Sequence, residues 1–164
     1  MTVANGVLGL TALRTRSEET AGTLAPSGAW YEATSAGSGV ALSGGRAVFA
    51  QLAGASATFT FTGTGVRWIG VPCEICGTAD VWIDGTRVTM VDTYAPARPA
   101  ASTTIFTSPA LAAGSHTLVI AVTGDRNGSS GGAFVVVDAF DVVLDGATLL
   151  PAIQTSPMAP AFIH

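Results

Sequence analysis

Polar and apolar residues alternate through residues 56–90, and this alternation predicts three β-strands separated by two turns. Ala57, Phe59 and Phe61 share one face of the first strand, and serine or threonine occupies each position on the other face. A period of two residues is typical of a strand that is buried on one side. A Gly-Thr-Gly turn at residues 63–65 precedes a second run rich in β-branched and aromatic residues, so we expect a hairpin.

The pair Asp84-Gly85 predicts a second hairpin, because both residue types tolerate the positive φ of a two-residue type I′ turn. The register that follows from this turn places these pairs opposite each other: Ile83 and Thr86, Trp82 and Arg87, Val81 and Val88, Ala79 and Met90. In this register the aliphatic residues meet on one side of the hairpin, and Trp82 and Arg87 meet on the other.

Further alternating segments at residues 46–52, 102–107 and 115–123 predict additional strands, and no segment has a convincing helical pattern. The run from Phe134 to Phe140 is apolar on both faces, as in a central strand covered on both sides. Eight or so short strands with glycine-rich turns predict an all-β fold, an antiparallel β-sandwich of the jelly-roll kind. The expected core comprises Ala57, Phe59, Phe61, Val81, Ile83, Val88, Leu118, Ile120, Val135 and Val137.

The composition argues against nucleic-acid binding and membrane insertion. With 164 residues, the chain is long enough for one domain with a substantial core. Its net charge is −4 and it contains no lysine, so we expect no nucleic-acid partner. No apolar run reaches the roughly 18 residues of a membrane span, so we expect no membrane insertion. Residues 1–13 lack a basic region and a small-residue cleavage site, and we interpret them as structural, not as a signal peptide.

Both ends of the chain predict arms outside the sandwich. We divide the chain into an N-terminal arm (1–27), a jelly-roll domain (28–145) and an extended apolar C-terminal arm (146–164). Pro151, Pro157 and Pro160 prevent a continuous helix in the C-terminal arm. Its apolar side chains would need a neighbouring subunit to cover them. The expected assembly interface comprises Leu149, Leu150, Ile153, Met158, Phe162 and Ile163.

Cys73 and Cys76 form a Cys-x-x-Cys motif between two predicted strands. A redox motif would need a helix N-terminus, which an all-strand neighbourhood does not supply. A zinc site would need two further ligands, and the available imidazoles are those of His116 and His164. Free thiols and a local disulfide are the remaining interpretations, and the sequence leaves the choice between them open.

Several segments taken together resemble β-sandwich modules of the galactose-binding-domain-like superfamily found in bacterial and phage proteins. These segments include GTGVRWIG at 63–70, VWIDG at 81–85, VDTY at 91–94, LAAGSHTL at 111–118 and VVDAFDV at 136–142, and the resemblance spans residues 28–143. It implies a non-catalytic module of the kind appended to secreted glycan-active enzymes or built into surface and virion proteins. It also implies a possible structural calcium near the last strand. The residues for such a calcium would be Asp138 together with an early acidic residue: Glu18, Glu19 or Glu32.

The candidate ligand-binding residues are Trp82, Arg87 and Tyr94. An indole ring can stack on a sugar, and neighbouring polar groups can bind its hydroxyls. Trp82 could equally be a cation–π partner of Arg87 or part of a second layer of core. Trp30 and Trp68 we assign to packing.

The sequence offers no nucleophile–base pair and no clustered carboxylates for acid–base chemistry, so we expect no enzyme. The apolar arms favour a structural or decorating protein of an assembled particle, such as a phage virion, with its own copies or other subunits as partners. The alternative is a carbohydrate-binding module or adhesin that recognises surface glycans. Either function would place the protein in a virion or on an extracellular surface.

Overall fold

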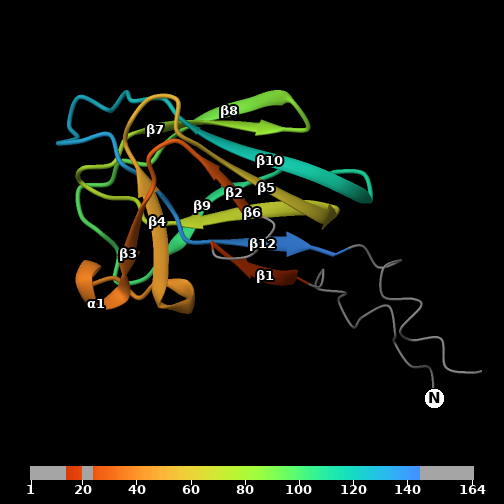
Figure 1. Ribbon diagram of the computed structural model, residues 1–164, viewed down its shortest axis with the longest axis horizontal. Coiled ribbons are helices and arrows are strands. Elements are labelled where there is room, and N and C mark those ends of the chain that lie inside the picture. Colours follow the sequence, from red (N-terminus) through yellow and green to blue (C-terminus); the bar gives the residue numbers. More distant parts are fainter. Residues whose placement is uncertain (1–13, 20–23, 145–164) are drawn as a thin grey trace, which may run out of the picture.

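The computed structural model describes residues 14–19 and 24–144, which form a β-sandwich (Figure 1). One sheet has four strands in the order β1-β12-β6-β9: β1 (Arg14–Glu18), β12 (Ala139–Val143), β6 (Gly65–Gly70) and β9 (Thr103–Thr107). The other has five strands in the order β2-β5-β10-β7-β8: β2 (Leu24–Ser27), β5 (Ser56–Gly63), β10 (Gly114–Val122), β7 (Thr78–Ile83) and β8 (Thr86–Asp92). Neighbouring strands are antiparallel, so the predicted fold class is confirmed.

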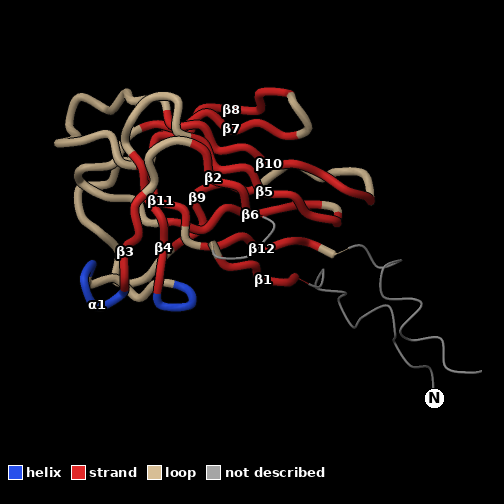
Figure 2. Tube along the Cα trace, viewed as in Figure 1, coloured by secondary structure: helices blue, strands red, loops and turns tan. Residues whose placement is uncertain are grey.

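A small third sheet extends the sandwich at one end (Figure 2). Its order is β11-β4-β3, with β11 (Val135–Val137), β4 (Arg46–Ala50) and β3 (Tyr31–Thr34). A single helical turn, α1 (Ser35–Ser38), follows β3, and the short 3-10 helix η1 (Ser43–Gly45) precedes β4. No helix among the described residues is long and apolar enough to cross a membrane.

The core lies between the four-stranded and five-stranded sheets. The rings of Phe59 in β5 and Phe140 in β12 stack with their centroids 4.2 Å apart, so they join the two layers. Trp68 is fully buried, and its indole nitrogen donates to the Val136 carbonyl at 3.1 Å. All of the expected core residues are buried with one exception, Val88.

Val88 is 40% exposed because the β7–β8 hairpin contains a bulge. The predicted turn is confirmed: Asp84 and Gly85 both have positive φ, at 49° and 79°. The predicted pairing holds for Trp82 with Arg87, but the register then shifts by one residue. Beyond the shift it is Val91, not Val88, that packs against the core.

The N-terminal boundary of the sandwich also differs from the prediction. Residues 14–18 and 24–27, which we assigned to an arm, form β1 and β2 and pair with β12 and β5. Residues 1–13, 20–23 and 145–164 lie outside the described part of the chain. The C-terminal arm and its assembly residues from Leu149 to Ile163 are among them, so that part of the prediction stays a prediction.

The last apolar run does not form one continuous central strand. It divides at Asp138, where the chain passes from β11 in the three-stranded sheet to β12 in the four-stranded sheet. The Asp138 amide donates to the Ile69 carbonyl at 2.9 Å, and the Glu19 amide donates to the Asp138 carbonyl at 3.1 Å. The junction therefore holds the end of β1 beside the place where the chain changes sheets.

Candidate functional site

A pocket of about 470 Å³ opens beside the three-stranded sheet. Phe49 of β4 and Phe134, which precedes β11, supply its aromatic surface. Ile75 adds an aliphatic side chain from the loop after β6, and Glu32 and Arg98 add opposite charges from β3 and the loop before β9. Mostly apolar pockets with a few convergent polar groups are typical of small-molecule binding sites.

The aromatic residues form a row across the neighbouring strands. Tyr31 lies opposite Phe49 in the β3–β4 ladder, with ring centroids 5.8 Å apart. The Phe49 ring meets the Phe134 ring edge to face at 5.6 Å. The Tyr31 residue is 58% exposed, so the row continues from the pocket onto the open surface. Such a row offers apolar contact area that extends beyond a single ring.

Two ion pairs each include one residue that lines the pocket. Arg46 and Glu32 approach to 3.3 Å, and Arg98 and Glu74 approach to 3.3 Å. All four side chains are about half exposed, so water screens both ion pairs and neither pair fixes the position of its side chains. Carboxylate oxygens at Glu32 and guanidinium nitrogens at Arg98 can therefore accept from and donate to a polar ligand at the rim.

Cys73 and Cys76 are joined in a disulfide, which decides between the interpretations that the sequence left open. Both residues are buried, with 4% and 0% exposure. The disulfide closes a four-residue loop, and the side chain of Ile75 within that loop lines the pocket.

The predicted ligand residues do not form one group. Trp82 is half-buried on the outer face of the five-stranded sheet, opposite Arg87. Both Nε and Nη2 of Arg87 donate to Asp80 Oδ1, at 3.0 and 2.6 Å. Tyr94 follows the end of β8 and forms a β-bridge with Cys73. It is seven residues from Arg87 along the chain, which corresponds to roughly 20 Å in an extended segment. A ligand role for any of the three residues stays a prediction.

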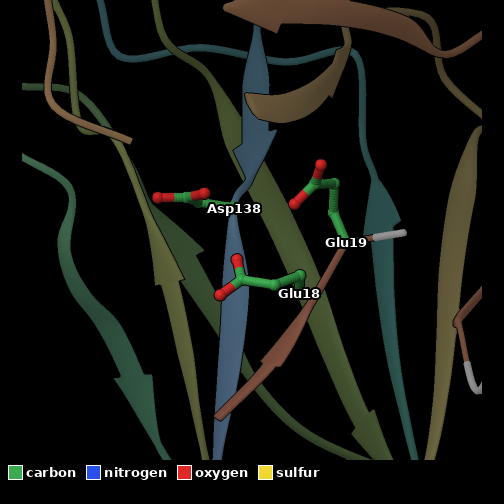
Figure 3. Close-up of side chains that lie close together, drawn as sticks. All are labelled: Glu18, Glu19 and Asp138. Carbon is green, nitrogen blue, oxygen red and sulfur yellow. The ribbon is translucent and has the colours of Figure 1, made fainter. Parts of the chain in front are cut away.

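Glu32 and Asp138, two of the four carboxylates that the sequence analysis named for a metal, are also in different places. Glu32 lies at the pocket, whereas Asp138 groups with Glu18 and Glu19 at the end of β1 (Figure 3). One carboxylate oxygen from each of these three residues lies within 4.8 Å of the others. The antiparallel β1–β12 pairing places Glu18 opposite Ala139, and this register brings the early acidic pair to the sheet junction.

Each of the three residues has a buried carboxylate oxygen without a hydrogen-bond partner among the described residues: Glu18 Oε2, Glu19 Oε2 and Asp138 Oδ1. Asp138 is fully buried and Glu19 is 8% exposed. Burial raises the pKa of both carboxyls, although hydrogen bonding lowers each pKa in part. At Asp138 the Ser43 amide, which donates to Oδ2 at 2.9 Å, contributes to this lowering of the pKa.

These residues fit a calcium ion. Calcium binds oxygen ligands at about 2.3–2.6 Å, so two ligands on opposite sides of one ion are roughly 4.6–5.2 Å apart. The spacing of the three carboxylate oxygens, within 4.8 Å, is compatible with a shared ion. Without a cation, neighbouring buried carboxylates are costly unless they bind protons. The cluster therefore contains three carboxylate oxygens without hydrogen-bond partners among the described residues, at the place where the resemblance implied a metal.

Comparison with known proteins identifies the class of fold. No protein-family model matches the sequence. A stretch of 76 residues, 46% of this chain, is 41% identical to the A type blood N-acetyl-alpha-D-galactosamine deacetylase of Flavonifractor plautii. The match spans 10% of that deacetylase, so the chain corresponds to a small part of its curated relative.

Two solved structures resemble the sandwich over most of its length. The CBM36-1 domain of a multidomain xylanase from the hindgut metagenome of Trinervitermes trinervoides is 14% identical, with a TM-score of 0.54. That similarity covers 82% of this chain and 99% of the domain. A family two carbohydrate esterase from Cellvibrio japonicus is 12% identical, with a TM-score of 0.55 over 81% of this chain and 34% of the esterase. These similarities confirm the β-sandwich fold that the sequence predicted.

Proposed function

We propose that this chain is a non-catalytic carbohydrate-binding module of a larger glycan-active protein, and that it binds glycan in the pocket at Phe49 and Phe134. The observation that carries the proposal is the aromatic pair in a pocket bordered by Glu32 and Arg98. The deacetylase match supports it, because a short stretch of a long enzyme is what an accessory module would match.

The pocket suits the two surfaces of a sugar. A pyranose ring has an apolar face of C–H groups that can pack against Phe49 and Phe134. Its hydroxyls lie at the ring edge, where Glu32 can accept hydrogen bonds and Arg98 can donate them. The name of the relative suggests the first ligands to test, glycans that end in N-acetylgalactosamine or galactosamine.

A binding role accounts for the residues better than catalysis does. The carboxylate at the pocket, Glu32, pairs with Arg46, and the three clustered carboxylates lie elsewhere and are largely buried. The virion role that the sequence favoured receives no support from the three proteins named above, whereas the alternative, a carbohydrate-binding module, agrees with them. Such a module would act at a cell surface or in a secreted protein.

The test is titration calorimetry against oligosaccharides that end in N-acetylgalactosamine, galactosamine, galactose or N-acetylglucosamine. We expect Phe134→Ala and Phe49→Ala to abolish measurable binding, because each removes stacking surface. Met90→Ala serves as the control, since it removes an exposed apolar side chain from β8, a strand that does not line the pocket, and should leave affinity unchanged. Unaltered affinity in both phenylalanine variants would refute the assignment of the pocket.

We also propose that Glu18, Glu19 and Asp138 hold a structural calcium ion. A cation there would supply the charge that the unpaired buried oxygens lack. These residues would then tie the end of β1 to the junction between β11 and β12.

A further inference from the structure

We propose that the Cys73–Cys76 disulfide positions one wall of the pocket and thereby sets its affinity for glycan. The inference rests on the proposed function, and it assigns a role to a motif that the sequence left unexplained. It makes both cysteines positioning residues, since they would act through Ile75 and the neighbouring pocket residues and not by touching the ligand.

The two residues enclosed by the disulfide both belong to the pocket region. Ile75 lines the pocket directly. Glu74 approaches Arg98 to 3.3 Å, and Arg98 lines the pocket from a different loop. The disulfide therefore restrains Ile75, which lines the pocket, and also Glu74, which forms an ion pair with the pocket residue Arg98.

Backbone hydrogen bonds extend this restraint to Phe134. The Phe134 amide donates to the Ile75 carbonyl at 3.1 Å, and the Gly77 amide donates to the Phe134 carbonyl at 2.8 Å. The aromatic residue is thus held on both sides by the loop that the disulfide closes.

The loop is also connected to the segment that carries Arg98. The Cys73 amide donates to the Thr93 carbonyl at 3.2 Å, and the Ala95 amide donates to the Cys73 carbonyl at 3.0 Å. The contacts of this one loop therefore reach Ile75, Phe134 and Arg98, which together form one wall.

The loop packs closely against its neighbours. A Cβ atom at Gly77 would lie 2.6 Å from both the Ala133 Cα and the Asp125 carbonyl oxygen. At Gly132 it would lie 2.8 Å from the Ile75 carbonyl oxygen. These distances show that backbone segments meet at the two glycines without room for a side chain, and the disulfide restricts the path of the loop covalently.

The opposite wall of the pocket does not depend on this loop. Phe49 and Glu32 belong to β4 and β3, whose ladder is formed by pairs such as Tyr31 with Phe49. Loss of the disulfide should therefore loosen one wall and leave the other in place. A preorganised site binds more tightly because less ordering is needed on binding.

The experiment compares the intact protein with the double variants Cys73→Ser/Cys76→Ser and Cys73→Ala/Cys76→Ala. We expect the dissociation constant for the oligosaccharide that the intact protein binds best to rise roughly tenfold, while the β-sheet circular dichroism spectrum is retained. Val142→Ala, a core variant in β12, is the control for a general loss of stability and should keep its affinity.

A second measurement separates positioning from mere stabilisation. Arg98→Ala should weaken binding less in the disulfide-free background than in the intact protein, because the loop no longer holds Arg98 in place. Equal losses in the two backgrounds, or unchanged affinity in both double variants, would overturn the proposal. Unfolding of both double variants and of the reduced intact protein would also overturn it, because the disulfide would then be required for the fold itself.

Amide hydrogen exchange gives a readout that does not need a ligand. Loss of the disulfide should speed exchange at Phe134 and Ala95, and leave amides of the β5–β10 ladder unchanged. If the intact protein binds no glycan in the panel, the proposed function fails, and faster exchange confined to the pocket wall would still support the positioning role. Unchanged exchange at both amides would refute it.

Discussion

Calcium should stabilise this protein, and its removal by EGTA should lower the melting temperature. An ion that binds the folded state alone stabilises it by about 2.7 kcal/mol at a concentration of one hundred times its dissociation constant. For a domain of this size, 1 kcal/mol corresponds to about 2–4 °C. We therefore expect a difference of roughly 5–11 °C between saturating calcium and EGTA, measured by differential scanning calorimetry.

Asp138→Asn sharpens this prediction because its effect should change sign with calcium. The amide keeps the shape of the side chain and an oxygen that can accept from the Ser43 amide, but it removes a fully buried charge. In EGTA the variant should be at least as stable as the original protein, since replacing a buried charge relieves desolvation. With calcium it should be less stable, because one ligand charge is lost.

The pH dependence provides an independent test of the same site. Burial raises the pKa of Glu19 and Asp138, so the calcium-free folded state binds protons more tightly than the unfolded state. Their contribution to stability is therefore lost as pH rises from the ordinary carboxyl range through the raised pKa. Calcium favours the deprotonated carboxylates, so the stabilisation by calcium should grow over this pH range.

The result that would refute the reasoning is a melting temperature that is the same in calcium and EGTA across the whole pH range, together with no calcium binding by calorimetry. Magnesium is the matched control. It requires a smaller, nearly octahedral site and dehydrates reluctantly, so it should stabilise the protein less than calcium at equal concentration.

Three further predictions concern other parts of the molecule. Phe59→Ala should lower the free energy of unfolding in urea by about 3–5 kcal/mol, because Phe59 is buried in the core. Thr58→Ala on the outer face should change it by less than about 0.5 kcal/mol. A loss below about 1 kcal/mol for Phe59→Ala would contradict the core assignment. The His116 ring bonds Asp84 and a backbone carbonyl, which raises the pKa of His116, so its stabilisation should be present below the ordinary histidine pKa and disappear as pH rises through the raised value. An NMR titration of the imidazole checks this, and a pKa at or below the ordinary histidine range would count against it. If Trp82 forms a platform, Trp82→Ala should weaken retardation on a polysaccharide gel and leave the melting temperature nearly unchanged; a large thermal loss would show that the ring is needed for packing.

The strands that the sequence predicted correctly are those whose pattern is local. In β5 and β10, alternation alone identifies the buried face, and turn residues fix the ends of the β7–β8 hairpin. The bulge in that hairpin has no comparable signal. It moves the buried position from Val88 to Val91 in β8, which is an edge strand of the five-stranded sheet.

The sequence could not identify β1 and β2 as strands of the sandwich. β1 reads Arg-Thr-Arg-Ser-Glu and contains no apolar residue, so it has no hydrophobic period to detect. It is a strand because it pairs with β12, more than one hundred residues later in the chain. For the same reason the sequence could not show which early acidic residue lies beside Asp138. The β1–β12 register brings Glu18 and Glu19 there and leaves Glu32 elsewhere.

Asp138 was named because the resemblance implies a calcium near the last strand, whereas nothing in the sequence pointed to the pocket. Its aromatic residues become neighbours only through the β3–β4–β11 ladder, where Tyr31 and Val136 both lie opposite Phe49. The switch of sheets at Asp138 explains why this ladder exists. It directs β11 away from the four-stranded sheet and onto β4, and so brings Phe134, which precedes β11, against Phe49. The change of sheet at Asp138 therefore places this metal candidate at the junction and also brings the aromatic residues of the pocket together.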